Sequence, residues 1–511
     1  MPIVMAIEPS IWGITLILML LLPWLVKYYK STFTHKLPPG PRKLPLIGNL
    51  HQLAVAGSLP HVALRDLAQK YGPLMHLQLG EISAVIASSP EMAKEIMKTH
   101  DVAFAQRPKV VPAQIFTYGG IDMAFAPYGD YWRQMRKICM LELLSAKKVQ
   151  AFSFIREEET AKFIESIKSS SGSVINLSNR ISKLISTSVF RAAFGNTCGD
   201  QDEFESLQKQ VAVHLGGFDL PDLFPSMEFI RVLTGKKSKL DNLQKQLDRI
   251  YDNIVTQHQE KLARAKEGKI EAQEEDLVDV LLRVQQSGSL GINMTTQHIK
   301  AMVSDIFVPG IDTAASTIDW AMVELMRNPR GRQKAQTELR QTFKGKKIIN
   351  EVDLEELSYL KLVIKEVLRL HPPAPLLLPR ESSELTIIDG YEIPMKTKIM
   401  VNVWAMGRDP KFWKDAEKFM PERFDGSSID FKGNNFEYLP FGAGRRICPG
   451  MTFGLASIML PLALLLHHFN WEFPNGMKPE DLDMTENFGL AIRRNGVLSL
   501  IPTLYDISLH E

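Results

Sequence analysis

Cysteine is scarce in this sequence. Only Cys139, Cys198 and Cys448 occur in 511 residues, which is too few for a disulfide framework and suits buried thiols in a reducing compartment. The chain also lacks a C-x-x-C pair and an H-E-x-x-H motif. The adjacent His467 and His468 would point about 100° apart on a helix, which makes them poor joint ligands. These absences argue against a disulfide-rich secreted protein and against a zinc enzyme.

No charge of one sign dominates the chain. Lys and Arg number 60 and Asp and Glu number 58, a formal net charge of +2, and no run of about five like charges occurs. No repeat of fixed period is present either. The composition therefore gives no indication of nucleic-acid binding or of a repeat architecture. With 45% hydrophobic residues, the chain can bury a large core.

One long apolar run stands near the N-terminus, from Ile11 to Val26, without a charged residue. With its flanks it predicts a transmembrane helix at about residues 10–29. Lysines follow the run at once, so the body of the protein is expected on the cytosolic side. A cleaved signal peptide is the alternative. We disfavour it because no positive charge precedes the run and no A-x-A-like site follows.

The chain divides into three predicted parts. Residues 1–30 are the membrane anchor. Residues 31–50 form a stiff hinge, because the stretch LPPGPRKLPLIGNL within them carries four prolines and two glycines. Residues 51–511 form the body, and no second shift of composition divides it. We therefore expect one large domain behind the hinge.

Helical patterns dominate the body, with short strand patterns between them. Three strands are expected near Leu74–Leu79, Ala84–Ala87 and Leu385–Ile388. A hairpin is expected in which Gly489–Arg494 pairs with Val497–Ile501 across Asn495-Gly496. The charged segment Gln257–Glu275 predicts a solvated helix end followed by a mobile loop. The fold class is therefore mostly α, in the α+β sense, with small sheets.

One predicted helix is unusually long. It runs from about Thr296 to Arg327, is apolar for most of its length, and would measure roughly 45 Å. Asn328-Pro329 ends it. Pro309-Gly310 lies at its middle, where both residues cost helix stability, so a functional reason for them is expected.

The segment FGAGRRICPG, from Phe441 to Gly450, carries the strongest chemical signal. Its glycines allow a tight turn and a close approach of the backbone to a flat ligand. Inward-pointing N–H groups are expected to favour the thiolate of Cys448, which is a good iron ligand. Arg445 and Arg446 add forks that suit a carboxylate. A lone cysteine near glycines would indicate only a buried structural thiol, but the whole decapeptide indicates more.

This decapeptide resembles the haem-binding signature of the cytochromes P-450, F-x-x-G-x-R-x-C-x-G. The positions are met by Phe441, Gly444, Arg446, Cys448 and Gly450. The resemblance implies the cytochrome P-450 fold and a haem b cofactor. It also implies that Cys448 is the axial ligand of the iron and that Phe441, Arg446 and Gly450 contact the haem.

A second motif lies in KEVLRLHPPAPLLLPR, where Glu366 and Arg369 are helix neighbours at i,i+3. Taken alone, the pair predicts only a surface ion pair of little energetic weight. In the family it is completed by an arginine of the P-E-R-F segment, here Arg423. The resemblance therefore implies a structural triad of these three residues behind the haem. Arg380 matches a position that reaches a haem propionate.

A third motif, from Trp132 to Arg136, resembles the W-x-x-x-R of the family, in which both ends hydrogen-bond a propionate. An indole N–H and a guanidinium have the chemistry for this role. An amphipathic helix with a packed tryptophan is the alternative.

A fourth motif, Pro309–Thr313, resembles [A/G]-G-x-[D/E]-T in the middle of the long helix. The resemblance implies that Asp312 relays protons from water and that Thr313 lies beside bound O2. A polar pair that bonds its own backbone is the alternative. The sequence departs from the pattern at Pro309, which removes an N–H and is expected to free the carbonyl of Asp305.

The resemblance covers the whole chain, and Gly216–Met227 and Phe488–Arg494 look like plant microsomal A-type members. It implies a monooxygenase of the EC 1.14 class: RH + O2 + two electrons + two protons give ROH + water. No G-x-G-x-x-G fingerprint is present. Electrons are therefore expected from NADPH through a separate cytochrome P-450 reductase, which would dock on Arg133, Lys137 and Arg445. The expected location is the endoplasmic reticulum membrane, single-pass, with a cytosolic catalytic domain in contact with lipid.

The substrate is expected to be small and apolar, because the implied pocket segments are mostly aliphatic, aromatic or small. These segments are Val110–Met123, His214–Phe218, Ala301–Pro309, Leu376–Leu378 and Leu490–Ala491. Terpenoids, alkaloids and phenolics of plant specialised metabolism all fit, and a terpenoid is the first choice. The alternatives are an O2-independent haem-thiolate isomerase and a non-catalytic haem-binding protein. The retained Asp312–Thr313 pair argues against both.

Overall fold

The computed structural model describes residues 35–54, 59–195, 201–216, 220–227, 229, 233–267, 275–288, 293–487, 489 and 491–505. The predicted transmembrane helix and the rest of the anchor lie outside these residues. Within them, one helix is long and apolar enough to cross a membrane, α19 (Met451–His468). That helix packs in the core of the body, with 61% of its residues buried.

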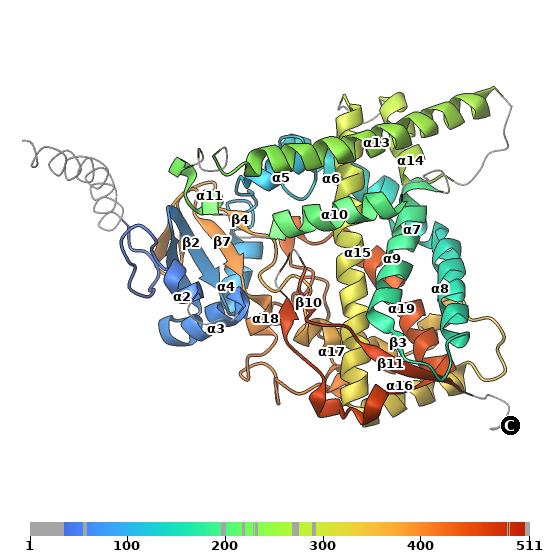
Figure 1. Ribbon diagram of the computed structural model, residues 1–511. Coiled ribbons are helices and arrows are strands. Elements are labelled where there is room, and N and C mark those ends of the chain that lie inside the picture. The colour runs from blue at the N-terminus through green and yellow to red at the C-terminus, as the bar shows by residue number, and fades with distance from the viewer. Residues whose placement is uncertain are drawn as a thin grey trace, which may run out of the picture.

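Helices make up most of the described fold (Figure 1). The long ones are α3 (Pro60–Tyr71), α8 (Ser153–Lys168), α9 (Leu177–Phe194), α10 (Gln201–Gly216), α13 (Lys236–Lys266), α14 (Leu277–Ser287), α15 (Thr296–Arg327), α16 (Pro329–Thr342), α17 (Tyr359–Leu370) and α19. The short ones are α2 (Leu50–Ala54), α4 (Pro90–Lys94), α5 (Val111–Phe116), α6 (Asp130–Ile138), α7 (Ala146–Ala151), α11 (Leu220–Leu223) and α18 (Val403–Met406).

The strands form small sheets. The largest among the described residues has the order β1-β2-β7-β4, from β1 (Leu74–Leu79), β2 (Ile82–Ala87), β7 (Lys398–Val401) and β4 (Arg380–Glu381). A second has the order β3-β11-β8, from β3 (Ile175–Asn176), β11 (Ser499–Leu504) and β8 (Phe469–Glu472). Two pairs remain, β5 (Thr386–Ile388) with β6 (Tyr391–Ile393) and β9 (Glu486–Asn487) with β10 (Arg493–Arg494). The three predicted strands correspond to β1, β2 and β5, and their bounds are confirmed to within two residues.

The predicted C-terminal hairpin is wrong. β10 pairs with β9, and β11 pairs with β3 and β8, so the two expected partners belong to different sheets. Gly496 has a φ of +76° and turns the chain between them. The arginines of β10 are held by acids on α15, whereas Leu498 and Leu500 are fully buried in the core. Ion pairs on one side of the turn and apolar burial on the other therefore override the local hairpin signal.

The long helix has the predicted bounds, and it crosses the middle of the molecule (Figure 1). A capping box between Thr295 and His298 begins it, and it ends at Asn328 before Pro329. It stays helical through Pro309 and Gly310. Because α9, α14, α17 and α19 all pack against it, α15 forms the wall on which the functional site is built.

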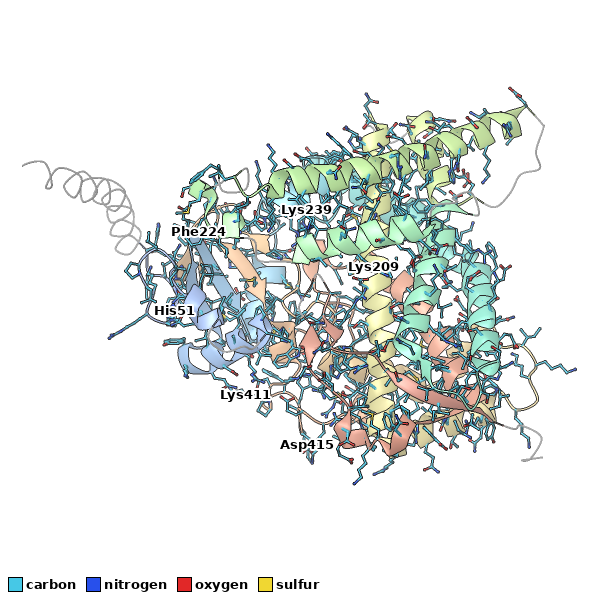
Figure 2. All side chains as sticks on the ribbon, in the orientation of Figure 1. His51, Lys209, Phe224, Lys239, Lys411 and Asp415 are labelled. Atoms are coloured by element: carbon cyan, nitrogen blue, oxygen red, sulfur yellow. The ribbon has the colours of Figure 1, made fainter. Side chains whose placement is uncertain are left out.

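The segment around Phe224 packs against the β1–β2 part of the largest described sheet. Phe224, labelled in Figure 2, belongs to an apolar cluster with Leu77 and Leu79 of β1. Its ring lies over Gly80, where an added Cβ would come within 2.8 Å of it. The amide of Glu81 donates to the carbonyl of Leu223 at 2.8 Å. These contacts tie the segment after α10 to the sheet and fix one side of the body.

Candidate active site

Cys448 lies on a tight loop directly before α19. Its amide donates to the carbonyl of Phe441 at 3.0 Å, which closes the loop. Gly444 has a φ of +68°, and a Cβ there would lie 2.2 Å from the carbonyl oxygen of Met97. No side chain fits at that position, so the glycine is required by close backbone packing. The amide of Gly450 donates toward the sulfur.

The thiol of Cys448 is not activated by its surroundings alone. Burial raises its pKa, and the Gly450 amide and the charge of Arg136 offset this only in part. The Gly450 amide therefore favours the thiolate as expected, but in the protein by itself burial is the larger effect. A metal cation opposite the sulfur would supply the missing stabilisation of the thiolate.

Buried arginines gather beside this loop. Arg446 donates to the carbonyls of Ala105 and Ala126 at 2.9 and 2.6 Å. Arg380 donates to Asp101 at 3.0 Å and to the carbonyl of Ala443 at 2.8 Å. The exposed neighbour Arg445 also pairs with Asp101. One carboxylate thus serves two arginines at this edge of the site.

Arg107 joins the cluster, and the motifs did not reveal it. Its guanidinium donates to the carbonyls of Ala124, Leu378 and Pro379 at 2.9, 2.8 and 2.8 Å. Burial lowers its pKa, and repulsion from Arg446 and Arg380 lowers it further. An Arg-Pro dipeptide has no periodicity or spacing that would have singled it out in the sequence.

The cluster holds more positive charge than its acids compensate. Burial and then repulsion from Arg380 lower the pKa of Arg446 to about 9. Burial also lowers the pKa of Arg380, although Asp101 opposes this. Buried charges of one sign need a partner. A ligand with two carboxylates, such as haem with its propionates, would fit this donor set.

Trp132 and Arg136 of α6 border the same region. The indole N–H of Trp132 donates to the carbonyl of Met123 at 2.9 Å, and Arg136 donates to the carbonyl of Ile447 at 2.8 Å. The guanidinium of Arg446 lies 4.4 Å from the centre of the Trp132 indole. The structure thus places both predicted propionate contacts beside the cysteine loop, with backbone carbonyls as their partners.

Asp312 and Thr313 lie at the middle of α15. Asp312 forms an ion pair with Arg493 of β10. The hydroxyl of Thr313 donates to the carbonyl of Pro309 at 2.7 Å. The local back-bonding considered as an alternative is therefore present at Thr313. It leaves the lone pairs of Oγ1 as hydrogen-bond acceptors.

The two arginines of β10 form ion pairs with two acids on α15. Arg494 lies 3.5 Å from Asp319, seven residues after Asp312, and Ser316 between them donates to the carbonyl of Ile492 at 2.9 Å. The motifs did not assign these arginines a role. The Arg-Arg doublet opposite two acids at i,i+7 on a predicted helix was the available signal.

Glu366, Arg369 and Arg423 come together as one buried cluster. The carboxylate of Glu366 accepts two hydrogen bonds from Arg369 at 2.8 Å each and one from Arg423 at 3.0 Å. Arg369 also donates to the carbonyls of Gly407 and Ala416 at 2.5 and 2.6 Å. Glu366 and Arg369 are 0% and 1% exposed, so the surface ion pair considered from the sequence is excluded.

A polar cavity of about 410 Å³ lies between α9, α10 and α15. It shares Phe307 with the predicted substrate lining and extends to Asp312 and Arg493. Ser186 and Gln208 also line it. The Ser186 hydroxyl and the Gln208 side-chain oxygen have no hydrogen-bond partner among the described residues. Such atoms are normally satisfied by water. Phe218 and Leu490, predicted for the substrate pocket, lie outside the described residues.

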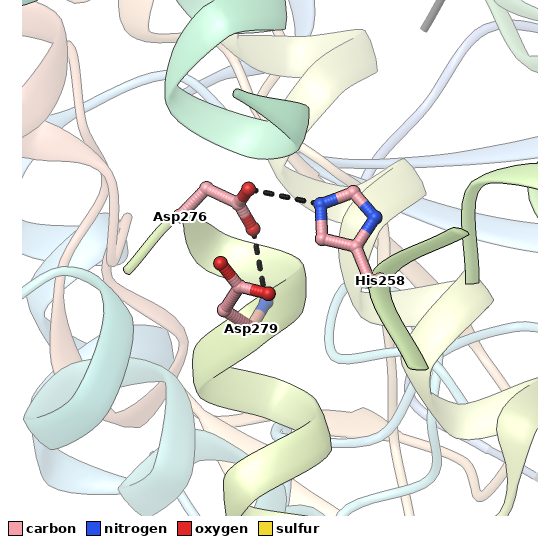
Figure 3. Close-up of side chains that lie close together, drawn as sticks. All are labelled: His258, Asp276 and Asp279. Atoms are coloured by element: carbon pink, nitrogen blue, oxygen red, sulfur yellow. Dashed lines mark hydrogen bonds and ion pairs between the residues drawn. The ribbon is translucent and has the colours of Figure 1, made fainter. Parts of the chain in front are cut away.

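A second polar cluster joins α13 to α14 (Figure 3). His258 contacts Asp276 at 2.9 Å, and its other ring nitrogen faces the carbonyl of Ile254 at 2.7 Å. A carbonyl only accepts, so the contact to Asp276 also needs a proton, as on an imidazolium. Lys261 bonds Asp279 at 2.9 Å. Two cations therefore balance two carboxylates, and we interpret the cluster as an ion-paired junction.

His258 also corrects an expectation from the sequence. It is 0% exposed, although it lies in the charged stretch predicted to be a solvated helix end. α13 continues to Lys266. Burial alone would lower the pKa of His258, but the hydrogen bond and charge of Asp276 outweigh it and raise the pKa.

This helical body with a half-buried cysteine loop and an arginine cluster is similar to known proteins. A family model described as Cytochrome P450 matches residues 38–498. Cytochrome P450 71D8 of Glycine max is 62% identical over 97% of this chain and 98% of its own length. Premnaspirodiene oxygenase of Hyoscyamus muticus is 52% identical over 97% and 98%. A solved zebra fish cytochrome P450 with abiraterone is 25% identical, covers 88% of this chain and 99% of its own, and has a TM-score of 0.74.

The class of protein is thereby defined as a haem-thiolate oxidoreductase. The chain belongs to the cytochrome P450 family. It is a monooxygenase of the EC 1.14 kind with a haem b cofactor. The predicted cytochrome P-450 fold is confirmed.

Proposed function

We propose that this chain is a reductase-dependent monooxygenase that inserts one oxygen atom into a small terpenoid, with Cys448 as the axial iron ligand. The observation that carries the site assignment is the excess of buried positive charge beside the Cys448 loop. Of the three buried arginines Arg380, Arg446 and Arg107, only Arg380 contacts a carboxylate among the described residues, that of Asp101, and the other two donate to backbone carbonyls. Two propionates would supply the counter-charge there.

The haem, when bound, supplies the activation of O2 and the electron transfer. The protein holds and delivers protons around it. Thr313 Oγ1 keeps its own proton on the Pro309 carbonyl and therefore offers lone pairs to a protonated neighbour. Asp312 borders the polar cavity and is held by Arg493. We assign Asp312 the transfer of protons from cavity water and Thr313 their positioning.

The substrate proposal rests on the lining and on one relative's name. The described parts of the lining, Val110–Met123, Ala301–Pro309 and Leu376–Leu378, are rich in aliphatic and small side chains. Premnaspirodiene, after which one relative is named, is a diene by its name, and the plant relatives lean toward terpenoid oxidation. An apolar pocket binds such a molecule mainly by removing its surface from water.

The electron donor is proposed to be a membrane-bound NADPH-cytochrome P450 reductase. Arg133 and Arg445 are about half exposed. Both reach Tyr128, since Arg445 donates to its hydroxyl at 2.9 Å and Arg133 lies 5.7 Å from its ring. With the exposed Lys137 they form one cationic patch. Such a patch suits an acidic partner surface and would speed association at low salt.

The proposed location is the endoplasmic reticulum membrane. Residues 1–30 would anchor the chain through a transmembrane helix at about 10–29, residues 31–50 would form the hinge, and residues 51–511 the cytosolic catalytic domain. The described end of the hinge supports this arrangement. The carbonyl of Lys36 accepts from Glu392 at 2.8 Å, and His35 contacts the same residue at 2.8 Å. The chain leading to the anchor is thus fastened to the body.

The test uses purified full-length protein with reductase, NADPH and a panel of terpene hydrocarbons. Substrate-dependent NADPH consumption with oxygen in the product supports the proposal. Turnover without NADPH would instead indicate an isomerase, and no turnover on the panel would contradict the terpenoid assignment. Separately, Cys448→Ala should remove the thiolate-type CO-difference band while Cys139→Ala keeps it. Persistence of the band in Cys448→Ala would overturn the assigned ligand.

A further inference from the structure

A buried acid, Asp122, and a half-buried acid, Asp305, lie between α15 and the segment that precedes α6. Asp122 is 1% exposed and accepts a hydrogen bond from the amide of Phe125 at 2.9 Å. Asp305 lies on α15 and accepts from the amide of Met123 at 2.5 Å. Each acid therefore holds a backbone amide of the same short segment, residues 122–126.

The two carboxyl groups lie within electrostatic range of each other, since the charge of Asp122 raises the pKa of Asp305. A carboxylate only accepts, so a bond between two such groups requires a proton on one of them. Asp122 Oδ1 has no N–H or O–H donor among the described residues, which leaves it available for this contact. A single proton shared between the two carboxyl groups would satisfy Asp122 Oδ1 and relieve the repulsion of two like charges.

The surrounding charges agree with this assignment. Burial raises the pKa of Asp122 to about 6. Burial and then the charge of Asp122 raise the pKa of Asp305 well above its ordinary value. The other titratable or charged groups that act on the pair, from every element packed against it, are Arg107, Arg446, Tyr131, Tyr251 and Cys139. The two arginines favour ionisation of Asp122 only in part, because burial is the larger effect.

The segment held by this pair also carries acceptors of the arginine cluster. The carbonyl of Met123 accepts from Trp132 at 2.9 Å and from Arg446 at 3.2 Å. The carbonyl of Ala124 accepts from Arg107 at 2.9 Å, and that of Ala126 from Arg446 at 2.6 Å. A shift of this segment away from α15 would therefore move the groups that aim the arginines.

We propose that Asp122 and Asp305 are positioning residues that share one proton, tie segment 122–126 to α15, and so hold the haem-facing arginines in place. The tie itself follows from contacts within this chain. Its consequence for haem rests on the proposed placement of the propionates.

The direction of the pH dependence follows from the proton. Both acids have pKa values raised in the folded protein, so their contribution is complete below the unfolded value of about 4 and is lost as pH rises through the folded values. Loss of the shared proton leaves two repelling carboxylates. The segment should therefore loosen as pH rises through the folded pKa of Asp305, because the pair still holds one proton after Asp122 ionises near pH 6.

Hydrogen–deuterium exchange of the holoenzyme tests the tie directly. Protection of peptides covering residues 118–127, corrected for intrinsic exchange, should fall by up to about tenfold per pH unit as pH rises through the folded pKa of Asp305, which lies well above the ordinary carboxyl value. Asp122→Asn donates an amide N–H to Asp305 without titrating, so its protection should be independent of pH. Asp202→Asn, at an exposed acid of α10, is the matched control and should keep the wild-type profile.

A flat wild-type profile, or an Asp122→Asn profile as steep as the wild type, would overturn the proposal. If Asp122→Asn fails to fold, Asp305→Asn offers the same exchange from the other side. Infrared spectra of the wild type should also show a protonated, D2O-sensitive carboxylic acid that Asp305→Asn lacks. Its absence in the wild type would equally contradict the shared proton.

The consequence for haem has its own readout. The rate of haem transfer to an excess of apomyoglobin should rise with pH in the wild type and stay flat in Asp122→Asn. If exchange depends on pH while haem transfer does not, the tie holds and the link to the arginines is wrong. None of these measurements involves turnover, so failure of the proposed oxidation would not mimic failure of the tie.

Discussion

The molecule contains two arginine clusters, one around Glu366 and one beside Cys448, and their arginines have different kinds of partner. In the cluster of Glu366, Arg369 and Arg423, both arginines contact the carboxylate directly. In the cluster beside Cys448, Arg380 and the exposed Arg445 contact the buried carboxylate of Asp101, and the described contacts of Arg107 and Arg446 are to carbonyl oxygens. Each arginine of the first cluster therefore has a carboxylate partner, although one positive charge remains uncompensated there. In the second cluster Arg107 and Arg446 have no carboxylate contact among the described residues, and we interpret that difference as the one between a ligand cradle and a structural brace.

The largest expected effect comes from breaking the Glu366 cluster. Glu366→Ala would leave two arginines in the interior without a counter-charge, at a cost of about 3–5 kcal/mol, which is a large share of the stability of a domain. We expect loss of folded protein on expression, or an unfolding midpoint far below the wild type in urea. Glu355→Ala, at an exposed acid, is the control. A wild-type midpoint for Glu366→Ala would show that the brace is dispensable.

A change in the cradle should affect the haem complex more than the apoprotein. Arg446→Gln removes one charge-assisted bond to a propionate, worth about 1.5–3 kcal/mol, so haem affinity should fall roughly 10- to 100-fold. Stability of the apoprotein should fall less, because repulsion from Arg380 is relieved. The same substitution at the exposed neighbour Arg445 should cost less affinity. Equal losses in apoprotein and holoprotein would make Arg446 a brace like Arg369.

The Thr313 hydroxyl has a hydrogen-bond partner within the protein, as the Glu366 cluster does, yet we assign Thr313 a role in oxygen chemistry at the haem. Thr313→Ala should leave haem binding and the CO band unchanged. Product formed per NADPH should fall about tenfold, with peroxide making up the difference. Thr317→Ala, one turn further along and bonded to the Thr313 carbonyl at 2.8 Å, is the matched control. Undiminished coupling in Thr313→Ala would place Thr313 with the structural residues.

The smallest effect is expected at the junction of His258, Asp276 and Asp279. Its acids are paired within the protein, but one of the pairs requires a protonated histidine. Because the pKa of His258 is raised, its contribution is complete below about pH 6.5 and is lost as pH rises through the folded value. The urea midpoint should therefore fall modestly on the alkaline side. His258→Gln should remove that part of the pH dependence. An unchanged profile would mean that the histidine is neutral.

Much of the site could be predicted from the sequence, since its signals are local. The glycines around Cys448 lie within one ten-residue motif, although the contact that requires Gly444 is made with the distant Met97. The bounds of α15 follow from its own cap and from Pro329. Glu366 and Arg369 are helix neighbours, and their partner Arg423 was supplied by family resemblance. Each of these features is encoded in a short window in which spacing alone sets the geometry.

The tertiary structure decided the rest, because it depends on contacts between distant segments. The sequence alone, through its motifs and their family resemblance, supplied the residues proposed for the iron chemistry: a cysteine on a glycine loop, an acid and a threonine on a long helix, and an arginine-rich surround. Only the fold places Arg107 near Arg446 and buries His258. It also pairs β10 with β9 and α15 instead of β11, and places Asp122 near Asp305. Burial and charge pairing across hundreds of residues leave no periodic trace in a single sequence, and they decide which charges need a ligand and which need a proton.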